Sequence, residues 1–225
     1  MEPWCILNRK TQLSISSSEK WNIGDPIALA YTGASGALYG LRLLECLLTA
    51  GQRIYLMIST AARIVLTTET KLEFPESPGE LEAFLGQYYN AAPGQLRIFD
   101  HQDWQAPLAS GSNPPAAMVV CPCTMGTLAA IAVGGSDNLV ERAADVCIKE
   151  GRRLILVPRE TPLSVIHLEN MLRLARLGVV ILPPNPGFYH HPTSVADIVD
   201  FVVARILDHL RVEHQLSERW GERIR

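Results

Sequence analysis

Short, continuously apolar segments alternate with segments of helical periodicity, and this alternation constrains the fold more than any other feature of the sequence. The apolar segments lie at residues 26–32, 53–58, 117–121, 153–158 and 179–183. Apolar residues recur at helical spacing at 37–51, 60–70, 79–90, 124–134, 138–151, 164–178 and 193–210. Strands that are apolar on both faces belong to parallel sheets covered by helices on both sides. The sequence therefore predicts an α/β fold: a single-domain, doubly wound (Rossmann-like), mostly parallel sheet with helices on both faces.

Length and composition fit one such domain. The chain has 225 residues, of which 48% are hydrophobic, and this is enough for a sizeable core. We assign residues 25–211 to the domain, residues 1–24 to a weakly ordered N-terminal extension and residues 212–225 to a charged C-terminal tail.

Charge and hydropathy disfavour several classes of protein. The 20 basic and 23 acidic residues give a net charge of -3, whereas nucleic-acid-binding proteins usually carry a basic excess. No apolar run reaches the roughly 18 residues of a membrane-spanning helix. The N-terminus lacks the basic start and long apolar stretch of a secretory signal. We therefore expect a cytoplasmic protein with no nucleic-acid partner and no membrane insertion.

The cysteines also indicate a reducing compartment. Their odd number and irregular spacing predict neither a disulfide framework nor a zinc site, and we expect them to be small buried hydrophobes. They are Cys5, Cys46, Cys121, Cys123 and Cys147.

Small polar residues follow the predicted strands at their carboxyl ends, where doubly wound folds bind ligands. Residues 33–36 follow the first strand, Ser59 the second, residues 124–127 the strand at 117–121, and Arg159 and Glu160 the strand at 153–158. Each group precedes a helix, whose free N–H groups suit a phosphate. Because position 35 is a serine, the first loop is not the G-x-G-x-x-G dinucleotide motif, and no Gly-Lys-Ser/Thr of a P-loop follows. These turns favour a mononucleotide such as FMN, although the first loop alone could simply be a tight turn.

Arg159 and Glu160 stand side by side at the end of a buried strand. Neighbouring residues of an extended chain point in opposite directions, so these two are poorly placed to pair with each other. We expect them to serve two different partners.

Four stretches resemble the flavin prenyltransferases of the UbiX type. They are residues 31–45, 57–66, 121–171 and 183–208, and they contain R-A-A-D-V, K-E-x-R, R-E-T-P-L and F-Y-H-x-P in this order. The resemblance covers nearly everything from Pro26 to Leu210. The paired Met and Asn motif of the related cysteine decarboxylases is absent, which favours the prenyltransferase branch.

The resemblance implies an enzyme that joins the dimethylallyl group of dimethylallyl monophosphate to N5 and C6 of reduced FMN. The product, prenylated FMN, would serve a UbiD-type decarboxylase. Such enzymes need no metal and assemble as homododecamers with active sites at subunit contacts. No D-D-x-x-D motif occurs in the sequence, so positive side chains would bind the prenyl phosphate in place of Mg²⁺.

The resemblance also implies roles for individual residues. FMN would be bound by Gly33, Ala34, Ser35, Ser59, Thr124, Met125, Gly126, Thr127 and Arg159. The prenyl phosphate would be bound by Lys149, Arg159, Tyr189 and Arg205. Catalytic roles would fall to Ser35, Glu69, Glu160 and Trp104.

Five of these residues have a simpler alternative role. Ser35 could relay a proton near N5 or only cap the following helix. Glu69 could be a solvated residue of a polar loop, and Trp104 could pack on the domain edge instead of facing the prenyl cation. Lys149 could be a surface residue near a helix end, and Arg205 could pair with Asp208 or Asp200.

Four residues beyond these sets also have predicted positions. His190 and His191 follow Tyr189 and either position its loop or lie on the surface. Thr161 and Pro162 are predicted to open the next helix, with Thr161 as its cap.

Two other functions stay open at this point. One is an FMN-dependent decarboxylase of the same fold, and the other is an FMN-binding accessory protein of a decarboxylase. An accessory protein would have no evident need for Lys149, Tyr189 and Arg205 beside Arg159, and a decarboxylase would turn over a carboxylic acid without any prenyl donor.

Overall fold

The computed structural model describes residues 25–217 and contains one parallel sheet. Its strands are β1 (Ile27–Tyr31), β2 (Ile54–Ile58), β3 (Leu96–Phe99), β4 (Ala117–Cys123), β5 (Arg153–Pro158) and β6 (Val180–Ile181). They are arranged in the order β3-β2-β1-β4-β5-β6, and all five neighbouring pairs are parallel. The predicted α/β fold is confirmed, and the sheet is parallel throughout.

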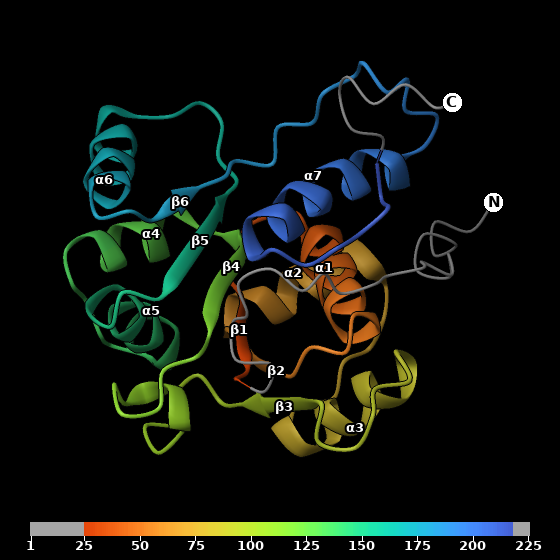
Figure 1. The fold of residues 1–225 in the computed structure, drawn as a ribbon, viewed down its shortest axis with the longest axis horizontal. Helices are drawn as coiled ribbons and strands as arrows, with labels where there is room; N and C mark the ends of the chain where they lie inside the picture. The colour runs from red at the N-terminus through yellow and green to blue at the C-terminus, as the bar shows by residue number, and fades with distance from the viewer. Residues whose placement is uncertain (1–24, 218–225) are drawn as a thin grey trace.

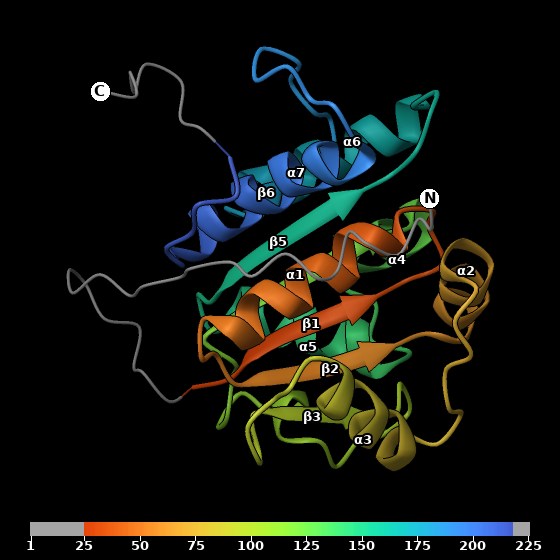
Figure 2. The same ribbon diagram turned by 90° about the vertical axis from the view of Figure 1, so that its right-hand side faces the viewer.

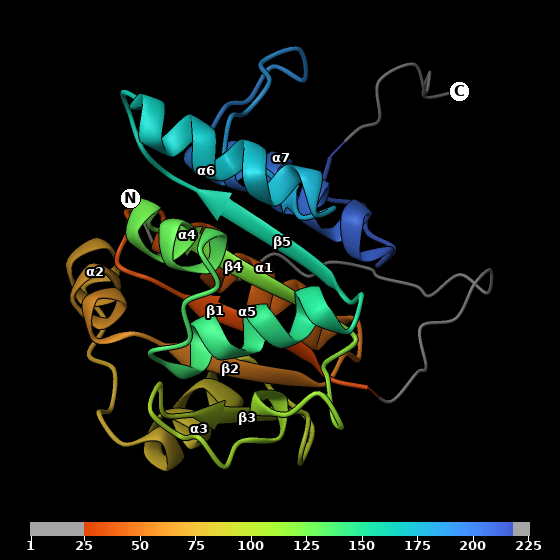
Figure 3. The ribbon, with the colours of Figure 1, turned by 90° about the vertical axis from the view of Figure 1, so that its left-hand side faces the viewer.

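Helices cover both faces of this sheet (Figure 1). The α-helices are α1 (Ala37–Thr49), α2 (Thr60–Thr70), α3 (Pro78–Tyr88), α4 (Met125–Ala132), α5 (Leu139–Lys149), α6 (Val165–Arg176) and α7 (Val195–Leu210). Helices α1 and α7 lie side by side on one face (Figure 2), and α4, α5 and α6 lie on the other (Figure 3).

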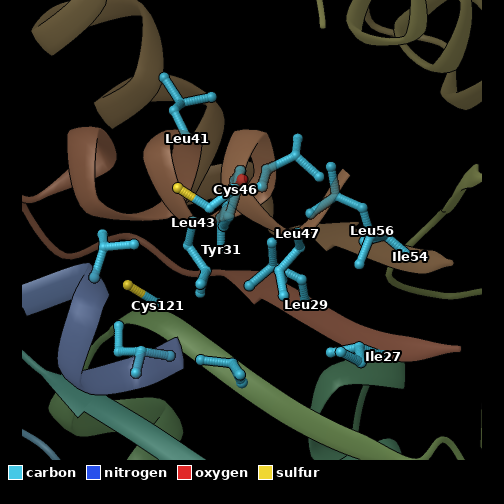
Figure 4. Packing of buried hydrophobic residues seen from close by; sticks show 14 of the residues in the cluster. Ile27, Leu29, Tyr31, Leu41, Leu43, Cys46, Leu47, Ile54, Leu56 and Cys121 are labelled. Atoms are coloured by element: carbon cyan, nitrogen blue, oxygen red, sulfur yellow. The ribbon is translucent and has the colours of Figure 1, made fainter. Parts of the chain in front are cut away.

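Strand β1 shows why the central strands must be apolar on both sides. Leu29 and Tyr31 point into the core beneath α1 and α7 (Figure 4), whereas Ala28 and Ala30 point into the core beneath α4 and α5. Successive side chains of a strand face opposite ways, so a sheet covered on both faces needs apolar residues at every position.

A buried ion pair joins α1 to α7. Arg42 is 2% exposed, and its Nε donates to Asp200 Oδ1 at 2.7 Å while its Nη1 donates to Glu45 Oε2 at 2.8 Å. Burial of a guanidinium is tolerated only when carboxylates compensate its charge. Helix α7, which carries Arg205, is thereby fixed against the helix that follows the first strand.

The structure corrects two local predictions. Strand β3 was not assigned from the sequence. Helix α6 begins at Val165 with Ser164 as its cap, so Thr161 does not cap it and Pro162 is not its first residue; the peptide bond between them is cis.

Other predictions fall partly or wholly beyond the described residues. The extension at 1–24 and the last part of the tail, 218–225, lie outside them. Within residues 25–217, no helix combines the length and apolar character needed to cross a bilayer.

Candidate active site

The strand order reverses between β1 and β4, and doubly wound folds bind ligands outside the carboxyl ends of the strands at such a reversal. In Figure 2 the arrows of β1 and β2 point toward α2, so the loops after the strands gather at this edge. The predicted FMN-binding residues follow β1, β2, β4 and β5, which are neighbours in the sheet. The structure therefore brings the predicted flavin-side residues to one edge.

Thr32, which is not among the predicted site residues, ties two of these loops together. Its hydroxyl donates to the carbonyl of Pro122 at 2.9 Å and accepts from the amide of Thr124 at 2.8 Å. Thr32 is 4% exposed, and its bond to Pro122 is buried while its bond with Thr124 is partly buried. The signal in the sequence was a hydroxyl residue that ends an apolar strand, directly before a glycine.

The loop after β1 is shaped by two glycines. A Cβ on Gly33 would lie 2.5 Å from that of Ala61, so only glycine lets the loop approach α2 this closely. Gly36 has a φ of 119° and is the N-cap of α1, with no side-chain cap. Ser35 therefore does not cap this helix, and the capping alternative for its hydroxyl is wrong.

Glu69 provides the anion at the start of α1. It lies in α2 rather than in a loop, and its carboxylate accepts from the amide of Gly36 at 3.0 and 3.1 Å and from that of Ala37 at 2.8 Å. A carboxylate is favoured here by the partial positive charge of a helix N-terminus. Glu69 thus braces the backbone directly after Ser35.

The turn after β4 begins α4 with a side-chain N-cap and leaves open space next to Gly126. Thr124 is the N-cap, and its hydroxyl accepts from the amide of Thr127 at 3.1 Å and lies 2.9 Å from the Thr127 hydroxyl. A Cβ on Gly126 would touch only Thr124 Oγ1, at 3.8 Å, so internal packing does not require this glycine. Met125 is buried beneath the turn. Open space over two hydroxyls and a helix N-terminus fits the phosphate of a mononucleotide.

Ser59 caps α2 in the same manner. Its hydroxyl accepts from the amide of Ala62 at 3.1 Å, and its own amide donates to the carbonyl of Tyr31 at 3.1 Å. Ala34 is buried within the loop after β1. Three consecutive loops of this edge are therefore built from backbone N–H groups and small residues, which can hold FMN without a metal.

Arg159 and Glu160 contact different groups, as expected. The Arg159 Nε donates to the carbonyl of Ser35 at 3.3 Å, which places the guanidinium beside the loop after β1. Glu160 accepts from the amide of Thr161 at 3.1 Å. Both side chains are exposed at this edge.

Tyr189 packs on α7 one helical turn before Arg205. The ring of Tyr189 packs edge-on against Phe201, with the ring centroids 5.8 Å apart. Phe201 and Arg205 are four residues apart on one helix and so share a face, about 6 Å from each other. Arg205 is 55% exposed and pairs with Asp208 at 2.7 Å, one of the two carboxylates considered from the sequence.

Two predicted residues lie apart from this cluster within one chain. Lys149 ends α5 at the opposite end of the sheet, where it pairs with Glu150, and the six residues of β5 span about 20 Å between that end and Arg159. Trp104 lies in the loop after β3, at the edge of the sheet, and is 47% exposed.

The thiols and acids of the described chain form no further site. Burial raises the pKa of Cys123 and Cys147 to about 12, and Cys46 and Cys121 are also buried, as expected of small hydrophobes. Among residues 25–217, no three His, Cys, Asp or Glu side chains are grouped to hold a metal ion.

Several known proteins are similar to this chain over most of its length. The sequence matches the family described as Flavoprotein over residues 15–207. It is 58% identical over 196 residues to the flavin prenyltransferase UbiX of Pseudomonas aeruginosa, covering 87% of this chain and 94% of the relative. It is 50% identical over 194 residues to the flavin prenyltransferase UbiX of Methanothermobacter thermautotrophicus, covering 86% and 94%.

Solved structures agree with these relatives. AnUbiX (PadA1) in complex with FMN and dimethylallyl pyrophosphate has a TM-score of 0.78 and 40% identity, covering 88% of this chain and 98% of that one. A dodecameric FMN-dependent UbiX-like decarboxylase from Escherichia coli O157:H7 has a TM-score of 0.75 and 44% identity, covering 88% and 100%. The resemblance seen in the sequence motifs is confirmed, and the chain belongs to the UbiX flavin prenyltransferases of the flavoprotein family.

Proposed function

We propose that this protein is a flavin prenyltransferase that attaches a dimethylallyl group to N5 and C6 of reduced FMN. The observation that carries the proposal is the convergence of Ser35, Glu69 and Arg159 at the strand-order reversal of a chain that is 58% identical to a UbiX enzyme. The product is prenylated FMN, with the phosphate of the donor released.

The loops after β1, β2 and β4 hold the flavin. The two threonines at the start of α4 and the N–H groups around them bind the ribityl phosphate, and Gly126 leaves the space for it. Reduced FMN supplies the nucleophilic N5 and C6. Residues 33–36 contact its edge, and Ser35 lies where its hydroxyl can carry a proton.

Positive side chains bind the phosphate of the donor. Arg159 lies beside the flavin loop, and Arg205 lies one helical turn from the residue that supports Tyr189. As the carbon–oxygen bond of the donor breaks, the guanidinium groups stabilise the negative charge that develops on phosphate. Trp104 is the candidate aromatic group for the positive charge that develops on the dimethylallyl group.

Two carboxylates contribute to the reaction in different ways in this proposal. Glu160 is exposed at the same edge as Arg159 and takes the proton lost from C6, or orients a neighbouring cation. Glu69 is committed to the amides of Gly36 and Ala37, so its contribution passes through the shape of the loop that carries Ser35.

The complete site needs more than one subunit. Lys149 cannot reach Arg159 of its own chain, because the length of the sheet separates them. Helix α6 and its C-cap expose apolar side chains that a partner copy would bury, namely Val165, Ile166, Leu168 and Leu172 of the helix and the cap residue Leu177. A structural relative at 44% identity is dodecameric. We infer a homo-oligomer, with a dodecamer expected, in which Lys149 of one subunit completes the donor site of another.

The recipient of the product stays a prediction, namely a UbiD-type decarboxylase. A cytoplasmic location also stays a prediction. The donor is dimethylallyl monophosphate by family resemblance, whereas the related AnUbiX structure contains the pyrophosphate.

One experiment separates the proposal from its alternatives. The purified protein is incubated with reduced FMN and either dimethylallyl monophosphate or dimethylallyl pyrophosphate. The mass of the extracted cofactor is then measured by mass spectrometry. We expect a flavin heavier by the prenyl group with one donor or both. Two structural relatives at 44% and 39% identity are described as decarboxylases. Carbon dioxide release from a carboxylic acid with unmodified FMN would favour that function instead.

A further inference from the structure

The loop that carries Tyr189 is built on α7. Residues 183–194 join β6 to α7 and project from the body of the molecule (Figures 2 and 3). A projecting loop needs specific contacts to hold one conformation, because few neighbours surround it.

Three rings provide such contacts in the middle of the loop. His190 stacks on Phe201 with the ring planes 9° apart and the centroids 5.1 Å apart. Tyr189 packs edge-on against both rings, with its centroid 5.8 Å from each. Stacked and edge-on pairs at these separations are the favoured arrangements of aromatic rings.

The two nitrogens of His190 are buried and have no hydrogen-bond partner among the described residues. Burying a polar atom without a partner is unfavourable. Within this chain, the useful contacts of the ring are therefore its flat faces and edges. This makes a testable distinction, because a phenylalanine would keep the ring and remove the unsatisfied atoms.

The surroundings of the stack fix its geometry on both sides. A Cβ on Gly187 would lie 2.9 Å from Tyr189 Cε1 and 3.2 Å from Phe201 Cζ, so the loop fits closely over these rings. One turn before Phe201, Asp197 accepts from the amides of Thr193 and Ser194 at 2.9 and 3.0 Å and holds the end of the loop.

We propose that His190 and Phe201 are positioning residues that hold Tyr189 beside Arg205 for binding of the prenyl phosphate. The proposal rests on the proposed function only for the identity of the ligand. The placement of Tyr189 follows from the ring contacts themselves.

The test compares His190→Ala with His190→Phe, and uses His191→Asn as the matched control. His191 is the exposed neighbour with a φ of 51°, a conformation that asparagine tolerates. The readouts are KM for dimethylallyl monophosphate, kcat, FMN affinity and the position of the Tyr189 ring in crystal structures. We expect His190→Ala to raise KM about tenfold, the order of magnitude of a lost pair of aromatic contacts, with FMN affinity unchanged.

The phenylalanine variant gives the sharper result. We expect His190→Phe to keep KM within about twofold of the natural protein and to keep its melting temperature, because stacking survives and two unpaired atoms disappear. Equal impairment of both His190 variants would overturn the proposal and assign the role to the ring nitrogens. An unchanged KM in His190→Ala would overturn it as well.

Two further arms keep the test decisive. If His190→Ala fails to fold, Phe201→Leu removes the stacking from the other side and is expected to raise the same KM. If the natural protein makes no prenylated flavin, the proposed function fails, while the crystal structures still decide the placement. A Tyr189 ring that stays in place in His190→Ala overturns the positioning role, and a displaced ring that is restored in His190→Phe supports it.

Discussion

Replacing Glu69 by alanine should destabilise the fold as well as impair flavin binding. The Glu69 carboxylate accepts from the amides of Gly36 and Ala37 at 2.8 to 3.1 Å, at the N-terminus of α1. A hydrogen bond to a charged group contributes about 1.5–3 kcal/mol, and charge at a helix N-terminus adds about 0.3–1 kcal/mol. Because the site is only partly buried, we expect a loss near the lower end, about 2–3 kcal/mol.

This loss is large enough to measure by thermal unfolding. For a chain of this length, each kcal/mol shifts the melting temperature by about 2–4 °C, so Glu69→Ala should melt about 4–12 °C lower. Glu69→Gln keeps one acceptor oxygen and loses the charge, so we expect a smaller decrease. Glu73→Ala is the matched control, because Glu73 is exposed in the segment that follows α2 and removal of a surface charge usually changes stability by less than about 0.5 kcal/mol.

FMN affinity distinguishes a structural role of Glu69, as a brace of the loop after β1, from a role in the reaction alone. The loop after β1 should lose order in Glu69→Ala, so FMN affinity, measured by fluorescence quenching, should fall together with the melting temperature. If Glu69→Ala has the same melting temperature as Glu73→Ala but loses turnover, the carboxylate acts only in the reaction and the bracing role is refuted.

Three other predictions concern stability, thiol reactivity and pH. Asp200→Ala leaves Arg42 buried without its main partner and should cost about 3–5 kcal/mol in urea unfolding, whereas substitution of the exposed Asp137 by alanine should be near neutral. In a Cys5→Ser variant the remaining thiols should react with a disulfide reagent only as the protein unfolds, because burial raises the pKa of Cys123 to about 12; fast native reaction would contradict the burial. Hydrogen bonds from Thr193 and Ser194 lower the pKa of Asp197 to about 2, so its contribution to stability is present above about pH 4 and is lost as the pH falls toward 2. In Asp197→Asn, the free energy of unfolding should depend less on pH between about pH 4 and pH 2. An unchanged pH dependence would argue against this role of Asp197.

The fold was predictable because its signal is local. A few neighbouring residues are enough to predict a continuously apolar strand, such as β1 or β5. The same holds for a helix start with a capping residue, such as Ser59 or Thr124. Strand β3 was missed because it has only four residues, one of which is an exposed arginine. The hydrogen bonds of Glu69 to the start of α1 could not be predicted either, because Gly36 lies 33 residues earlier in the chain and no local sequence pattern links the two.

The same reasoning explains which parts of the site could be predicted. Carboxyl ends of neighbouring parallel strands must meet, so Ser35, Thr124 and Arg159 could be grouped from the strand pattern alone. The grouping of Tyr189 with Arg205 depends on Phe201, an aromatic residue in an apolar helix that looks like ordinary core from its sequence. The family resemblance named both residues but did not give the contact with Phe201 that places Tyr189 one helical turn from Arg205.

The division of the site has a consequence for how it is assembled. The flavin side is held within one chain by Thr32, by the helix caps and by Glu69, so it should form in an isolated subunit. The donor side depends on a projecting loop and, in our proposal, on Lys149 from another subunit. Since the donor phosphate carries the negative charge that these cations must balance, affinity for the donor should depend on subunit association far more than affinity for FMN. A subunit that binds FMN but not the donor is therefore the expected state of a dissociated protein.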